Sequence, residues 1–250
     1  MERSELDAWL RLTLTPGVGN HTVRRIAPDG NVGTPAGRAG QQRAADGLGR
    51  EARFRCPSDV GVDASGNVYV ADSGNHTIRK ISPSGWVSTI AGKLEMKSGS
   101  TVGGYADGKG TAARFRAPRG LAVDGSGAVY VADSDNGVIR KLSPDGSVKT
   151  VAGLAGSTGF VNGSGAAARF NGPQGLAVDA SGTVYVADTW NAALRAVTPD
   201  GRVTTVTNGA AVFGSPRDVA VDGRRGLIVV DNDRQTLCRV RPGRNVEPIA

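Results

Sequence analysis

The chain repeats one short block four times, and this repetition limits the folds it can adopt more than any other feature. The copies lie at 61–85, 121–146, 176–201 and 219–243, and a fifth, shorter copy lies at 20–30. A block of this size cannot bury its own apolar surface, so successive copies must stack against one another. We therefore expect an array. Residues shared by all copies are expected to serve the copy itself, and function should be sought where the copies differ.

One copy predicts four short antiparallel strands. Within residues 115–153, the turn sequences at 125–127 and 144–146 contain Gly or Pro and separate short apolar runs. The second run, Val129 to Asp133, has apolar or small residues on both alternating faces, so it requires neighbours on both sides. Four antiparallel strands without helix-period segments are typical of a propeller blade. The sequence thus predicts an all-β propeller.

The composition agrees with this fold class. The chain has 250 residues with 37 Gly and only 5% aromatic residues, which suits many short strands joined by tight turns. The net charge of +7 is spread along the chain, so it forms no basic stripe of the kind that marks nucleic-acid binding. Cys56 and Cys238 occupy unrelated slots of their copies, and we expect two buried free thiols rather than a disulfide.

Several motifs keep a fixed spacing from copy to copy. They are Pro-x-Gly-Leu-Ala-Val-Asp, Gly-x-Val-Tyr-Val-Ala-Asp-Ser, Asn-His-Thr-Ile-Arg-Lys-Ile and Pro-Asp-Gly. With these motifs the chain resembles the NHL-repeat family of β-propellers over about residues 20–250. The resemblance implies a propeller that is typically six-bladed.

The repeat boundaries give the expected domain organisation. We expect an N-terminal segment at 1–19 that could add one strand, then an NHL-like propeller at 20–250. The propeller comprises a partial blade at 20–37 and full blades at about 54–92, 115–153, 170–207 and 213–250. Four full blades and a partial one predict an incomplete or truncated ring. The open blade edges of such a ring favour self-association.

The connections between strands predict which face of the disc binds a partner. In a four-stranded meander, the second connection of each blade lies on the same face as the link to the next blade. The links at 38–53, 93–114, 154–169 and 207–212 are long and variable, whereas the first and third connections are minimal turns. Long loops on a rigid scaffold commonly carry binding residues. We call the face that carries the links and the second connections the link face. The opposite face, which carries the first and third connections, is the hairpin face.

The candidate binding residues come from the variable positions of this link face. Trp190 is interpreted either as a contact anchor or as a side chain packed over a neighbouring loop. Tyr105 and the lysines of the second link make it mildly basic and amphipathic, and a solvated loop is the favoured interpretation of these residues over a binding surface. The predicted set is Trp190, Tyr105, Lys93, Lys97, Lys109, Arg38 and Arg43.

Three links share the ending Gly-x-Gly-x-x-Ala-Arg-Phe, which closes at Phe54, Phe115 and Phe170. Gly-x-Gly can mark a phosphate site, but here it does not open a helix after a strand. We therefore favour a structural role in which Phe plugs the interface between blades.

A recurring aspartate ends the second strand of every copy. The four are Asp72, Asp133, Asp188 and Asp231. Such a ring of carboxylates could hold a hard cation such as calcium. Their recurrence instead favours a role in which each Asp caps its own loop through backbone N–H groups.

No assembled catalytic constellation is expected. His21 and His76 occupy equivalent slots, which does not predict a catalytic zinc site, and no Gly-x-Ser-x-Gly elbow precedes a helix. We predict a non-catalytic propeller without cofactor or metal, acting as a protein- or ligand-binding scaffold or sensor module. The resemblance to bacterial NHL domains implies a protein, peptide or glycan partner. The alternatives are an RNA-binding NHL propeller and a channel-sited lyase or hydrolase, such as the peptidyl-amidating lyases with NHL-like repeats.

The N-terminal residues 1–17 are charged and contain no apolar run of signal-peptide or membrane-span length. No membrane association is expected. The expected location is cytoplasmic if Met1 is the true start and extracytoplasmic if upstream sequence is missing.

Overall fold

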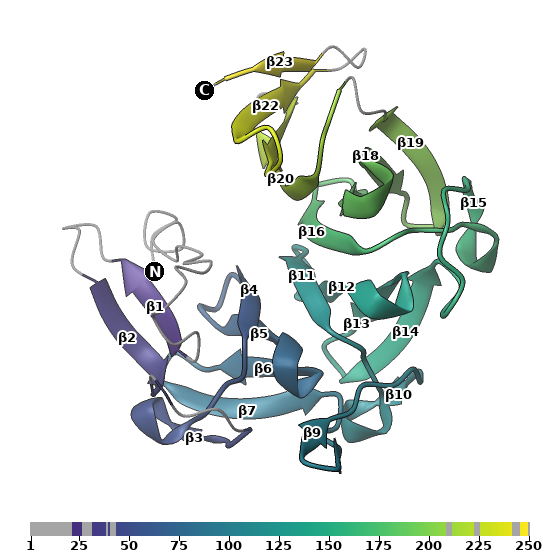
Figure 1. The fold of residues 1–250 in the computed structure, drawn as a ribbon. Coiled ribbons are helices and arrows are strands. Elements are labelled where there is room, and N and C mark those ends of the chain that lie inside the picture. The colour runs from purple at the N-terminus through teal and green to yellow at the C-terminus, as the bar shows by residue number, and fades with distance from the viewer. Residues whose placement is uncertain are drawn as a thin grey trace.

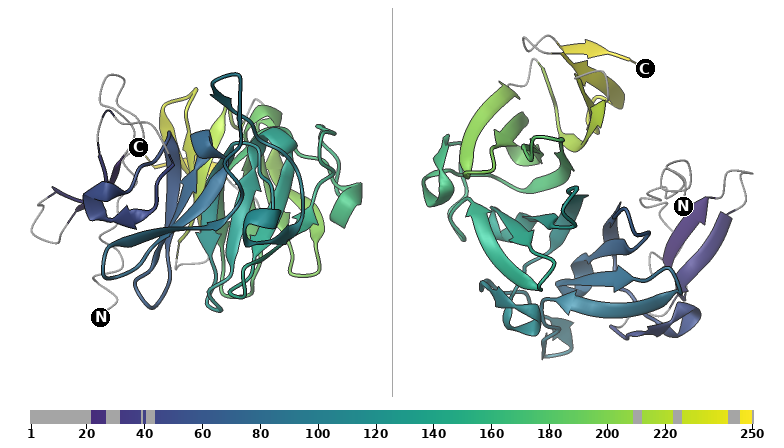
Figure 2. Two further views of the ribbon diagram at one scale, coloured as in Figure 1. Left: turned by 90° about the horizontal axis from the view of Figure 1, so that it is seen from below. Right: turned by 180° about the vertical axis from the view of Figure 1, so that it is seen from behind.

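The described strands are arranged as successive β-sheets around an open arc, as Figure 1 shows. The computed structural model describes residues 22–26, 32–38, 40, 44–208, 212–222, 226–241 and 246–249. The right-hand view in Figure 2, from behind, shows the sheets side by side around the same arc. This confirms the predicted all-β propeller with four full blades and a partial N-terminal one.

Each full blade has four antiparallel strands in chain order. The first blade contains β4 (Pro57–Val62), β5 (Val68–Asp72), β6 (Thr77–Ile81) and β7 (Trp86–Ala91). The second contains β11 (Pro118–Val123), β12 (Val129–Asp133), β13 (Val138–Leu142) and β14 (Ser147–Ala152). The third contains β16 (Pro173–Val178), β17 (Val184–Asp188), β18 (Ala193–Val197) and β19 (Arg202–Asn208). The fourth contains β20 (Pro216–Asp222), β21 (Gly226–Asp231), β22 (Thr236–Val240) and β23 (Val246–Pro248).

The first three blades carry a short fifth strand that the sequence did not predict. These strands are β3 (Gly47–Leu48), β10 (Gly108–Lys109) and β15 (Gly163–Ser164), and they pair with β7, β14 and β19. Each is built from the Gly-x-Gly ending of a link. The second Gly of this ending is the first residue of a one-turn 3-10 helix. At Gly110 it has a φ of +55°, a backbone conformation that residues with a side chain rarely adopt. The shared link ending therefore docks the link against the outer edge of its blade.

The apolar core lies between blades, and a phenylalanine occupies each interface. Phe54, Phe115, Phe170 and Phe213 are at most 1% exposed. Phe115 packs with Ala71 and Ile78 of the blade before it and with Val131 of its own blade. Burying such a ring contributes on the order of 2–3 kcal/mol. The predicted role of this residue as an interface plug is confirmed.

The two ends of the arc differ in how they are covered. At one end, β1 (Thr22–Ile26) and β2 (Val32–Gly37) place Val23 and Ala36 against Phe54, as the outer half of a blade would. At the other end, Val230 and Leu237 of the fourth blade are each 39% exposed. The side chains in the same slots of the first three blades are fully buried, namely Ala71, Ala132, Ala187, Ile78, Ile139 and Leu194.

The two cysteines have different environments. Cys238 is buried as expected, but the expectation of a buried thiol is wrong for Cys56, which is exposed. The slot of Cys56 holds Gly172 in the third copy, where the ring of Trp190 covers it. The first copy has Gly74 in the slot of Trp190, and Gly74 has no side chain to cover the thiol. Among the described residues, no helix is long and apolar enough to cross a membrane.

Candidate functional site

A buried arginine joins the body of each of the first three blades to the link that precedes it. In the second blade Arg140 is fully buried, and its Nη1 donates to Asp133 Oδ2 at 2.8 Å and to the carbonyl of Arg114 at 3.0 Å. Its Nη2 donates to Asp107 Oδ1 and to the carbonyl of Ala106, both at 2.7 Å. We call this arrangement the arginine lock.

The aspartate of the lock also caps its own loop. Asp133 Oδ1 accepts a hydrogen bond from the backbone N–H of Arg116 at 2.7 Å, and Oδ2 accepts one from Asn136 Nδ2 at 2.9 Å. The first and third blades repeat this pattern with the sets Asp72, Arg79, Asp46 and Asp188, Arg195, Asn162. The local capping role predicted for the recurring Asp is therefore confirmed in these blades. The arginine partner was missed, although it follows each Asp by seven residues.

Burial raises the pKa of the lock aspartates Asp72 and Asp133 to about 6. The facing arginine and the hydrogen bonds from asparagine and backbone N–H groups lower the pKa and limit the rise. Both carboxyls are thus ionised at neutral pH and pair with a buried guanidinium. The fourth blade departs from this pattern, since Cys238 holds the arginine slot and Arg234 lies 3.8 Å from Asp231 instead.

Aromatic rings enclose the lock in two of the blades. The guanidinium of Arg140 lies 5.1 Å from the ring centroid of Phe115 and 4.9 Å from that of Tyr105. Arg195 lies between Phe170 and Phe160 in the same way. Contacts of this kind are worth about 0.5–2 kcal/mol each. Tyr105 is 47% exposed and its hydroxyl is hydrogen-bonded to Thr150 Oγ1 at 2.9 Å, so this predicted site residue also serves the lock.

Trp190 is the most exposed of the large hydrophobic side chains described, at 66%. It lies on a 3-10 turn, Thr189–Asn191, between β17 and β18. Its backbone N–H donates to the carbonyl of Asn171 at 3.1 Å, and a Cβ built on Gly172 would come within 2.6 Å of its ring. The interpretation of Trp190 as a side chain packed over a neighbouring loop is therefore supported, and its role as a contact anchor stays a prediction. One side of the ring rests on a neighbouring loop, and the rest faces solvent.

The structure spreads the other predicted site residues over several blades. Lys93 is exposed and forms an ion pair with Glu95 at 3.4 Å, while Lys97 and Arg38 are exposed. Lys109 is exposed on β10 and lies beside Gly146, in a turn of the hairpin face. Arg43, like His21, lies outside the described residues.

His76 connects the loop after β5 to the second blade. Its Nδ1 accepts a hydrogen bond from the backbone N–H of Ala117 at 3.0 Å, so the imidazole is neutral there. Burial lowers the pKa of His76, and the charges of Arg55 and Arg116 lower it further. Asp135 and a hydrogen bond with the backbone of Thr101 act in the opposite direction. This histidine is a structural latch on the link face.

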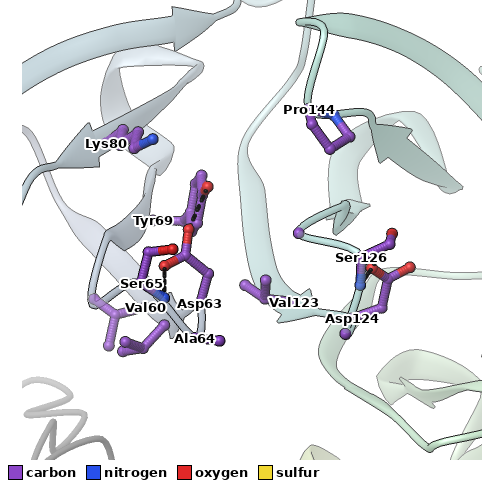
Figure 3. A pocket seen from close by; sticks show the side chains of 13 residues that line it. Val60, Asp63, Ala64, Ser65, Tyr69, Lys80, Val123, Asp124, Ser126 and Pro144 are labelled. Carbon is purple, nitrogen blue, oxygen red and sulfur yellow. Dashed lines mark hydrogen bonds between the residues drawn. The ribbon is translucent and has the colours of Figure 1, made fainter. Parts of the chain in front are cut away.

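The hairpin face carries a groove of about 890 Å³ between the first and second blades (Figure 3). Asp63, Tyr69 and Lys80 line it from the first blade, and Asp124 and Ser126 from the second. Asp63 Oδ2 accepts a hydrogen bond from the Tyr69 hydroxyl at 3.0 Å, and burial with this bond raises the pKa of Tyr69 to about 12. The sequence predicted only tight turns here. The acidic groups of the groove are already engaged in holding those turns.

The link face carries a smaller cavity of about 450 Å³ in the first blade. Its lining residues are Ala44, Arg55, Asn75, Leu94, Met96, Gly99 and Thr101. Among the described residues, no group of three His, Cys, Asp or Glu side chains could hold a metal ion.

The repeats can be compared with known proteins once the blades are defined. The NHL repeat matches residues 54–81, 115–142 and 170–197, which begin at the plug phenylalanine and end with the third strand of each blade. The chain belongs to the NHL-repeat family. It is 30% identical over 195 residues to NHL repeat-containing protein 2 of Bos taurus, covering 75% of this chain and 26% of that relative. It is 33% identical over 97 residues to the Arabidopsis thaliana protein SUPPRESSOR OF QUENCHING 1, chloroplastic, covering 39% of this chain and 9% of that relative.

This NHL chain thus spans about a quarter or less of these curated relatives. Among solved structures, it resembles a chain of the nidogen/laminin complex with a TM-score of 0.62 and 17% identity, over 93% of this chain and 76% of that one. It also resembles streptogramin B lyase, with a TM-score of 0.60 and 13% identity over 96% and 74%. A gluconolactonase from Xanthomonas campestris has a TM-score of 0.62 and 18% identity, over 92% of this chain and 68% of that one. At these identities the likeness shows the propeller fold alone.

Proposed function

We propose that this NHL propeller is a non-catalytic scaffold or sensor module that binds a protein, peptide or glycan through its link face. The observation that carries the proposal is Trp190, whose ring is 66% exposed although its position is fixed by Asn171 and Gly172. A large aromatic side chain that is already held in place loses little conformational freedom when a partner binds. Such residues are enriched among those that dominate binding energy.

The different locations of the shared and the variable residues support the same proposal. In the first three copies, the recurring Asp and Arg are engaged with each other inside the blade, so they are not offered to a partner. The residues that differ between copies lie in the links and the short loops. A propeller of similar fold occurs in the nidogen/laminin complex, which supports a protein as partner class.

Self-association is part of the proposal. The far face of the fourth blade exposes Val230 and Leu237, where the other blades bury their counterparts. Terminal repeats that face water usually carry polar side chains on their outer surface. RNA binding and a channel-sited lyase or hydrolase activity stay predictions of the sequence.

The test is a selection of ligands that does not presuppose a face. A displayed random peptide library and a glycan panel are screened against the wild-type chain. The ligands obtained are then titrated into Trp190→Ala and into Lys80→Ala, which alters the groove of the hairpin face. We expect Trp190→Ala to weaken binding by about 30-fold, as for an aromatic anchor worth about 2 kcal/mol, with an unchanged melting temperature. Ligands that lose affinity for Lys80→Ala but not for Trp190→Ala would contradict the proposal.

A further inference from the structure

One blade of the three that contain the arginine lock lacks the aromatic side chain on the link side of the lock. Tyr105 and Phe160 hold this slot in the second and third blades and lie within 5 Å of the buried guanidinium. The corresponding residue of the first blade is Ala44, which precedes the lock residues Ala45 and Asp46. Ala44 lines the cavity of about 450 Å³ on the link face. The absence of a ring at position 44 therefore coincides with a cavity.

A small hairpin supplies a second wall of this cavity. Strands β8 (Met96–Lys97) and β9 (Ser100–Thr101) pair within the long link that follows the first blade. Leu94 and Met96 contribute apolar surface, and Met96 is 59% exposed. Methionine adapts its shape to flat apolar or aromatic groups. The cavity thus combines a flexible apolar wall with a volume in the range of about 300–1,000 Å³ that is usual for small-molecule sites.

A single cation gives the cavity its polar character. Arg55 lines it, and its Nη1 donates to Thr101 Oγ1 at 2.9 Å, which fixes the side chain against the hairpin. Among the described residues, no carboxylate forms an ion pair with this guanidinium, which has further N–H donors. The floor is polar but occupied, because Asn75 donates to Asp72 Oδ2 at 2.8 Å. An anionic group is therefore the polar group this cavity can best receive.

We propose that the cavity binds a planar aromatic group that carries a carboxylate, such as an aromatic residue at the C-terminus of a peptide. The ring lies against Leu94 and Met96, and the carboxylate pairs with Arg55. The inference deepens the proposed function and rests on it, because it names the ligand chemistry of one part of the link face.

The test uses N-acetylphenylalanine and its neutral counterpart N-acetylphenylalaninamide, each titrated into the full chain and followed by NMR. We expect the acid to bind at least ten-fold more tightly than the amide. Arg55→Gln should remove this difference, whereas Lys149→Ala, which removes one positive charge from β14, should preserve it. Equal affinity of acid and amide for the wild-type chain would overturn the proposal.

A second variant uses the chain's own repeat as its design. Ala44→Tyr introduces the side chain that the second blade has in this slot, so it narrows the cavity with a residue the fold accepts elsewhere. We expect both probes to lose at least ten-fold in affinity, while the melting temperature stays at or above that of wild type. Unchanged binding to this folded variant, or no binding of the acid to wild type, would overturn the inference.

The experiments distinguish a failure of the cavity inference from a failure of the proposed function. If ligands from the library depend on Trp190 and N-acetylphenylalanine does not bind, the cavity inference is wrong and the proposed function stands. If the acid binds with the expected dependence on Arg55 while library ligands ignore Trp190, the proposed function is wrong and the cavity stands.

Discussion

Each buried arginine of the first three blades ties three parts of the chain together. Arg140 reaches the aspartate of its own blade, the backbone of the link and Asp107, the residue directly before the fifth strand. The sequence made the recurring Asp recognisable as a loop cap. It did not identify the arginine, because charged side chains are almost never fully buried unless they are paired. The partner is visible only after folding brings positions 107, 133 and 140 together.

Replacing Arg140 by Met should therefore be strongly destabilising. The variant leaves the buried carboxylate of Asp133 without its counter-charge, which costs about 3–5 kcal/mol in comparable buried pairs. The matched control is Lys141→Met on the same strand, whose side chain is partly exposed and 3.8 Å from Asp124. Urea unfolding measures both. A loss for Arg140→Met no larger than that for Lys141→Met would show that the lock adds little stability.

His76 should make the stability of the fold depend on pH. Its pKa is lowered by burial, so below the ordinary value of 6.5 the unfolded chain takes up a proton that the folded chain does not. The stability contributed by the neutral imidazole is complete above pH 6.5 and is lost as the pH falls from there toward the lowered pKa. The buried Asp72 and Asp133 act oppositely, because their stabilising contribution is lost as pH rises from 3.8 to about 6.

The histidine is isolated by comparing wild type with His76→Gln, since the aspartates are the same in both. The Gln side chain can still accept the Ala117 N–H but does not titrate. We expect the melting temperature of wild type to fall relative to that of His76→Gln as the pH drops from 7.5 to 5.5. A difference that stays constant over this range would refute a neutral His76 latch.

At the scale of elements, the fifth strands depend on tertiary contacts rather than on local sequence. The four strands of each copy follow from period-two patterns and turn residues, which the sequence displays. The two-residue strand β10 has no such pattern, and it forms because Asp107 bonds both Arg140 and Thr150. The cavity beside Ala44 was missed for a similar reason, since it depends on one absent ring and on a hairpin formed far along the chain.

Asp107→Ala should release this edge of the second blade. The carboxylate accepts from Thr150 Oγ1 at 3.0 Å and from the Thr150 backbone N–H at 3.2 Å, and losing these bonds should cost about 1–3 kcal/mol. Hydrogen exchange of the backbone amide of Gly110, which donates to the carbonyl of Gly146 at 2.9 Å, should become faster. Asp107→Asn is the control, because Asn162 holds this slot in the third blade and bonds Arg195 at 2.8 Å. Equal exchange in the two variants would contradict this role.

At the scale of the whole molecule, the two ends of the arc differ chemically. The far face of the fourth blade exposes the apolar side chains Val230 and Leu237. In the first three blades the side chains at the same two positions are apolar and buried between blades. We expect sedimentation to show association that increases with concentration. Leu237→Glu should shift the equilibrium toward monomer, whereas Val161→Glu, at an exposed position of a link, should not. A wild-type chain that stays monomeric at all concentrations would rule out this interface.

In the proposed function, the link face and not the hairpin face receives the partner. Amide hydrogen exchange of the chain with and without a ligand from the library distinguishes the two faces, because it reports on both at once. We expect protection in the loops at 73–76, 134–137 and 189–192 and in the links at 93–101 and 154–162. Protection confined to the hairpin turns at 63–67 and 124–127, which border the groove between the first two blades, would contradict it.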